Sequence, residues 1–184
     1  MRIEKLIQEH NVTIKWVHFP LHPDTPEKGR SLEDLFAGRD YDIAKMQQEM
    51  SARMSAEGLP YGNRTHTYNS RLAQELGCWA DTQPDGARFH DAVFRAYFVD
   101  GRDVGDRDTL VDIAQSVGLS ATDAAEVIDK RSFKEAVDAD WDKSRALGVT
   151  GVPTYVAGGY GVVGAQPYEA LVSLVDQVRK DNSA

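Results

Sequence analysis

The sequence predicts an α/β protein in which a long helical block interrupts an α/β domain. Three observations support this fold class. The chain opens with an amphipathic helix pattern followed by an alternating segment at 12–19. It closes with a hairpin pattern and a last helix, whereas residues 31–131 show helical periodicity almost throughout. This order indicates one α/β layer with an insertion rather than two successive domains.

Composition excludes several functions. The 184 residues include 41% hydrophobic and 27% charged side chains, which suffices for one sizeable core. Acidic residues outnumber basic ones 29 to 21, and the net charge of −8 makes nucleic acid a poor partner. No apolar run approaches the roughly 20 residues that span a bilayer, and the opening MRIEKLIQEHN does not have the pattern of a signal peptide. We therefore expect a cytoplasmic protein with no membrane partner.

The first predicted helix buries the face that carries Ile3, Leu6, Ile7 and His10. No capping residue precedes this helix, which suggests that its start lies upstream of Met1. Residues 12–19 (VTIKWVHF) alternate apolar and polar side chains and predict a strand. A helix that leads into a strand is the second half of a β-α-β unit. The first strand of that unit is therefore expected before Met1.

Residues 29–132 are predicted to form an inserted helical subdomain, entered through the proline-rich loop PLHPDTPEKG. Helices are expected to start at capping or proline residues and to end at glycines. The expected starts are Ser31, Asn69 or Ser70, Pro84 and Ser120, and the expected ends include Gly58, Gly101 and Gly118. One stripe that should face a core consists of Ile43, Met46, Met50 and Met54.

The α/β domain is predicted to be discontinuous, with residues 1–28 and 133–184. Ser132-Phe133-Lys134-Glu135 has the capping-box pattern of a helix that Gly148 ends. The segment TYVAGGYGVV (154–163) predicts two short strands joined by a tight turn at Gly158-Gly159. Pro167 lies at the first turn of the last predicted helix.

Five segments carry a resemblance to a known family. They are FPLHPDTPEKG (19–29), NSRLA (69–73), VFRAYFVDGRDVGD (93–106), and ALGVTGVPTYV followed by VVGAQPYE (146–169). In these segments the sequence resembles the DsbA-like thioredoxin proteins, and within them the FrnE-like branch. That branch is similar to 2-hydroxychromene-2-carboxylate isomerases and kappa-class glutathione transferases. The resemblance implies a thioredoxin-like fold with a large helical insertion, whose first strand is missing from the chain as given.

The resemblance also implies a substrate-binding loop. In this family the peptide bond before the loop proline is cis, which implies a cis Val152-Pro153 bond here. Substrate contact is then assigned to Val152 and Pro153, with Thr150 and Gly151 shaping the loop. From residue statistics alone, only about 5–6% of X-Pro bonds are cis, so a trans proline that starts an edge strand is the alternative.

Relatives carry Cys-x-x-Cys, or a lone Ser or Cys in the isomerase and transferase branches, at the end of the first strand. The present chain begins after that motif, so no catalytic residue is assigned. Cys78 is the only cysteine, and we interpret it as a small packing residue of the helical block. Dithiol exchange needs two neighbouring sulfurs, so the chain as given is expected to be redox-inactive. Without the first strand, the predicted strands at 12–19 and 154–157 lose their shared neighbour. They should then pair with strands of another subunit or exchange partners within the chain.

Three functions remain open, with an enzyme favoured. The first is a DsbA-family, FrnE-like dithiol-disulfide oxidoreductase. The second is a glutathione-dependent isomerase or transferase, for which glutathione would be the one cofactor. The third is a non-catalytic binding or dimerisation module, with a homodimer as its assembly. The expected partner is a thiol or disulfide protein or a small molecule. No metal site is expected, because His18, His22, His66 and His90 are not at ligand spacing.

Overall fold

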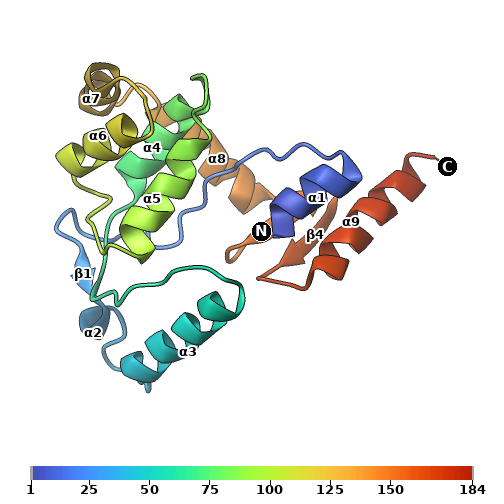
Figure 1. Ribbon diagram of the computed structural model, residues 1–184, viewed down its shortest axis with the longest axis horizontal. Coiled ribbons are helices and arrows are strands. Elements are labelled where there is room, and N and C mark those ends of the chain that lie inside the picture. The colour runs from blue at the N-terminus through green and yellow to red at the C-terminus, as the bar shows by residue number, and fades with distance from the viewer. Residues whose placement is uncertain (1, 184) are drawn as a thin grey trace. The chain divides into compact units, whose positions relative to one another are not determined.

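The computed structural model describes residues 2–183 (Figure 1). The chain forms two compact units, one made of Met1–Leu21 with Asp140–Ala184 and the other of His22–Ala139. The sequence predicts boundaries at 28/29 and 132/133, whereas these units divide at 21/22 and at 139/140. The second division falls within helix α8 (Lys134–Ala146). A sequence pattern marks where such a helix begins, whereas packing changes partway along it.

The first unit contains α1 (Arg2–His10), a hairpin of β3 (Thr154–Ala157) and β4 (Tyr160–Val163), and α9 (Tyr168–Asp181). The hairpin is antiparallel and pairs Thr154 with Val163 and Ala157 with Tyr160. Gly158 and Gly159 have φ angles of 56° and 85°, as a two-residue type I′ turn requires. The predicted hairpin and last helix are therefore confirmed. Helix α9 packs against both strands and against α1.

The predicted strand at 12–19 is wrong. The segment has no strand conformation, and within the described part of this unit β3 pairs with β4 alone. Alternation shows which side chains share a face, but a strand also needs a neighbour with which to exchange backbone hydrogen bonds. His18 instead binds to α8, because its backbone amide donates a hydrogen bond to Asp140 Oδ2 over 3.0 Å. The strand expected before Met1 lies outside the described residues.

The second unit is helical. Its helices are α2 (Leu32–Leu35), α3 (Ile43–Ala56), α4 (Arg71–Ala80), α5 (Arg88–Phe98), α6 (Arg107–Ser116) and α7 (Ala121–Lys130). Two short strands, β1 (Arg30–Ser31) and β2 (His66–Thr67), pair antiparallel. The predicted caps at Ser31 and Ser120 are confirmed, since each hydroxyl accepts from the amide three residues on. No helix between residues 2 and 183 is long and apolar enough to cross a membrane.

The core of the second unit lies among α4, α5, α6 and α7. Its most buried large side chains are Leu76, Phe89 and Leu110, each at most 1% exposed. Full burial of one such side chain contributes roughly 1.5–3 kcal/mol to folding. The start predicted at Pro84 is wrong, because residues 81–87 form turns and α5 begins at Arg88. Gly86 permits this tight path: a Cβ there would lie 1.7 Å from the Ala80 carbonyl oxygen.

Two predicted core faces are more exposed than expected. Helix α3 has no buried residue, and Met46 and Met50 on its apolar stripe are 38% and 43% exposed. In α1, Leu6 is buried but Ile7 is 40% exposed. Periodicity reports that apolar side chains share one face of a helix. It does not report whether another element covers that face.

Candidate functional site

The loop at Thr150–Pro153 is positioned by the end of α8. Gly148, with a φ of 67°, donates to the Arg145 carbonyl over 3.0 Å, and Val149 donates to the Ser144 carbonyl over 3.0 Å. This pair of bonds is a Schellman motif, which turns the chain out of the helix. The positive φ explains why a glycine ends the helix at this position.

The loop itself is fixed at its two flanks. The Thr154 hydroxyl donates to the Gly151 carbonyl over 2.7 Å, and the Gly164 amide donates to the Pro153 carbonyl over 2.7 Å. The Val152-Pro153 peptide bond is cis, which is the isomer that the family resemblance implies. The Thr154 side chain and the hairpin residue Gly164 therefore hold the loop in a defined shape.

Between these flanks the backbone is open. The Val152 side chain is 52% exposed, and Thr150 and Pro153 are also exposed. Within the described part of the chain, neither the amide nor the carbonyl of Val152 forms a hydrogen bond. Exposed backbone groups beside a strand can pair with an extended segment of another molecule. The four residues predicted to bind substrate thus form one accessible loop, while their contact with a substrate stays a prediction.

A polar cluster that the sequence did not indicate lies in the same unit. Asp140 Oδ2 is 3.0 Å from His18 Nδ1 and also accepts from the His18 amide. Ser144 Oγ donates to the His18 carbonyl over 3.1 Å. The side chains of His18 and Asp140 are only 14% and 19% exposed. A carboxylate on one imidazole nitrogen fixes the ring's tautomer and orientation, as proton-transfer sites require.

No local signal could have identified this cluster, because His18 and Asp140 are 122 residues apart in the sequence. From the sequence, His18 was weighed only as a metal ligand, and no other ligand lies at a suitable spacing from it. Cys78 lies on α4 and is half-buried, and the neighbouring Trp79 is buried in the core. The expected catalytic position before Met1 lies outside the described residues.

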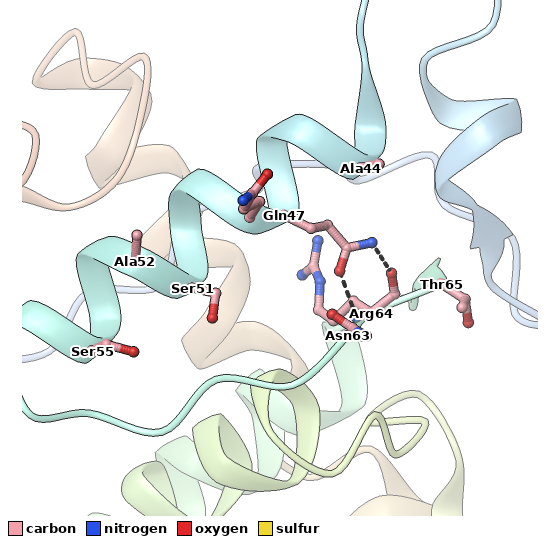
Figure 2. A pocket seen from close by; sticks show the side chains of 9 residues that line it. Ala44, Gln47, Ser51, Ala52, Ser55, Asn63, Arg64 and Thr65 are labelled. Atoms are coloured by element: carbon pink, nitrogen blue, oxygen red, sulfur yellow. Dashed lines mark hydrogen bonds between the residues drawn. The ribbon is translucent and has the colours of Figure 1, made fainter.

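The second unit has a cavity of about 690 Å³ along α3 (Figure 2). Its wall is made of polar and alanine side chains of α3 and of residues 63–65. The side-chain amide of Gln47 joins the two walls by accepting from the Arg64 amide and donating to the Arg64 carbonyl. The sequence pattern gave no indication that Gln47 and Arg64 lie together, since they are 17 residues apart in the sequence.

Comparison with known proteins agrees with the fold and with the expected branch. YwbO, an uncharacterized protein of Bacillus subtilis, is 23% identical over 182 residues, which cover 96% of this chain and 88% of YwbO. The crystal structure of a probable DsbA oxidoreductase from Streptomyces coelicolor is 28% identical, with a TM-score of 0.87 over 97% of this chain and 82% of that one.

A structure of 2-hydroxychromene-2-carboxylate isomerase has the same fold, with 19% identity and a TM-score of 0.75 over 99% of this chain and 89% of that one. These neighbours are of the kinds that the FrnE-like resemblance implies. The model of the DSBA-like thioredoxin domain matches residues 1–176. With nearly its whole length matched, the chain belongs to the family of DSBA-like thioredoxin domains.

Proposed function

We propose that this chain is an FrnE-like member of the DsbA family whose Thr150–Pro153 loop binds an extended thiol- or disulfide-containing substrate. The observation that carries the proposal is that Val152 is an exposed residue whose amide and carbonyl have no hydrogen-bond partner within residues 2–183. An extended substrate would satisfy both groups and pair with the loop as an added strand. Side-chain recognition would then contribute less than the backbone.

The proposal includes a limit on turnover. Reduction or oxidation of a substrate disulfide by a dithiol mechanism needs two sulfurs in the protein, and this chain has one cysteine. The 184-residue chain by itself therefore binds its substrate without cycling between dithiol and disulfide. A chain with a single cysteine forms no internal disulfide that would need an oxidising compartment, which supports our proposal of a cytoplasmic location.

An NMR titration with a short extended peptide that contains an intramolecular disulfide tests the binding loop. We expect chemical-shift changes centred on Thr150–Thr154. Val152→Pro removes the amide donor and should weaken binding by about fivefold, since one net hydrogen bond contributes about 1 kcal/mol. Val152→Ala keeps the backbone groups and should bind nearly as well. Shift changes confined to other segments, or equal losses in both variants, would refute the loop assignment.

The single cysteine favours a second candidate, a glutathione-dependent isomerase or transferase, because glutathione supplies the reacting sulfur. Conjugation of glutathione to 1-chloro-2,4-dinitrobenzene distinguishes this candidate from disulfide reduction, which is measured with insulin. Glutathione conjugation above the uncatalysed rate supports the second candidate. Insulin reduction by the chain contradicts the limit on turnover. If the chain shows neither activity but still binds the peptide, the result supports a non-catalytic binding module. Light scattering would then measure whether this module forms a homodimer.

A further inference from the structure

Arg64 is held by two separate elements of the helical unit. Its main chain is fixed by Gln47 of α3, whose Oε1 accepts from the Arg64 amide over 3.0 Å and whose Nε2 donates to the Arg64 carbonyl over 2.6 Å (Figure 2). Its guanidinium carbon lies 4.6 Å from the ring centre of Tyr97 and 5.2 Å from that of Phe98, both on α5. The side chain is therefore confined before any ligand binds.

Among the residues that the structure describes, the guanidinium nevertheless has no polar partner. Arg64 Nε is buried without a hydrogen bond, and no acidic side chain among residues 2–183 forms an ion pair with Arg64. Nearly all buried donors in folded proteins are satisfied, so an exception calls for an explanation. A guanidinium stacked on aromatic rings with its donors unused is suited to bind a carboxylate.

A second charge lines the same small cavity. This cavity has a volume of about 230 Å³, and its wall includes Arg64, Tyr68, Tyr97 and Asp100. The Asp100 carboxylate forms no hydrogen bond or ion pair with any residue that the structure describes. A cation and an anion thus border one cavity without pairing, although opposite charges that could meet would attract each other.

Other polar side chains also line this cavity, among them His66, Tyr68 and Tyr97. The Tyr97 hydroxyl donates to Thr67 Oγ1 over 3.3 Å, and the Tyr68 ring stacks on His66 with ring centres 5.9 Å apart. Burial raises the pKa of Tyr68, and the charge of Asp103 raises it further, so the phenol stays protonated at neutral pH. A protonated phenol can donate a hydrogen bond to an anionic group.

We propose that this cavity binds a small zwitterion of the α-amino-acid type, with its carboxylate at Arg64 and its ammonium group at Asp100. A ligand with both charges pairs with both side chains. A simple anion would be repelled by the Asp100 carboxylate, and a simple cation would be repelled by the Arg64 guanidinium. The volume suits a free amino acid rather than a longer peptide. This site does not depend on the function proposed for the Thr150–Pro153 loop.

Three matched probes test the site on the full chain by NMR titration. L-alanine carries both charges, propionate lacks the ammonium group, and ethylamine lacks the carboxylate. We expect L-alanine to perturb the amides of 63–68 and 97–101 and to bind at least about tenfold more tightly than either one-charge probe. Equal binding of propionate and L-alanine overturns the zwitterion, and no binding of L-alanine overturns the site.

Variants assign the two charges. Arg64→Gln should weaken L-alanine binding by about tenfold or more, and Arg64→Lys should restore part of it. Asp100→Asn should weaken L-alanine binding while leaving propionate binding equal or tighter. Arg53→Gln, on an exposed part of α3, is the matched control and should change nothing. If Arg64→Gln does not fold, the Arg64→Lys and Asp100→Asn results decide, and unchanged L-alanine affinity in both contradicts the proposal.

Discussion

At the scale of single residues, Glu75 is the most heavily constrained charge in the helical unit. Its side chain on α4 is 1% exposed and accepts from Arg71 Nε over 2.6 Å and from Arg131 Nε over 2.7 Å. Burial alone would raise the pKa of Glu75, but the hydrogen bonds from Arg131 and Arg71 outweigh it and hold the pKa below the ordinary value of 4.5. Glu75 is therefore a buried anion that depends on two cations from α4 and from the end of α7.

Removing this charge should destabilise the fold. Glu75→Gln leaves Arg131 without a carboxylate and Arg71 with Asp138 as its carboxylate partner. We expect a loss of about 2–4 kcal/mol in the free energy of unfolding at pH 7. Urea denaturation measures the loss. Glu126→Gln is the matched control, because Glu126 is 57% exposed and pairs with Lys130 at the surface. That control should lose less than about 0.5 kcal/mol. Equal losses in both variants would mean that burial of the pair does not matter.

The same pair gives a pH dependence with a definite sign. Because the folded-state pKa of Glu75 is lowered, its contribution to stability is complete above the unfolded-state pKa and is lost as pH falls through the folded-state pKa. The difference in unfolding free energy between the wild type and Glu75→Gln should therefore be largest near neutral pH. It should shrink as the pH is lowered below about 4.5. A difference that stays constant down to acid pH would contradict the assignment to this carboxylate.

At the scale of elements, local sequence signals predicted most helix ends and turns correctly. Contacts between segments distant in sequence could not be predicted. Ser31, Gly148 and the Gly158-Gly159 turn act within a few residues of themselves, so the sequence shows their effect directly. The strand at 12–19 and the methionine face of α3 failed, because each depends on a neighbour that no local pattern reveals. The Gln47–Arg64 and His18–Asp140 contacts were invisible for the same reason. The family resemblance indicated the Thr150–Pro153 loop in advance, and its contact with a substrate stays a prediction.

Helix α3 should be held mainly by Gln47. No other helix or strand packs extensively against the described residues of α3, and the Gln47 amide forms two hydrogen bonds to Arg64. Gln47→Leu should therefore raise hydrogen-exchange rates across Ile43–Ala56 by about tenfold or more, since two hydrogen bonds contribute roughly 1–3 kcal/mol. Exchange in α4 to α7 should not change. Gln48→Leu, at the exposed neighbouring position, is the control, and faster exchange in both variants would assign the effect to general loosening of the helix.

At the scale of the whole molecule, the two units differ in how the chain builds them. Residues 22–139 form a continuous segment, whereas the other unit is made of two segments that the helical unit separates in sequence. The large buried cluster, from Ala73 to Ile128, lies entirely within the continuous segment. The Glu75 ion pairs with Arg71 and Arg131 lie within it as well. The helical unit therefore contains the interactions that its own stability requires.

An isolated fragment of residues 22–139 should accordingly fold on its own. We expect a helical circular dichroism spectrum and one cooperative urea transition, because the fragment keeps a complete apolar core. Leu76→Ala, at a fully buried position, should destabilise the fragment and the full chain by similar amounts of about 2–5 kcal/mol. Similar losses are expected because the contacts of Leu76 are the same in both proteins. A fragment that unfolds without a cooperative transition, or a Leu76→Ala loss found in the full chain alone, would show that the helical core depends on the rest of the protein.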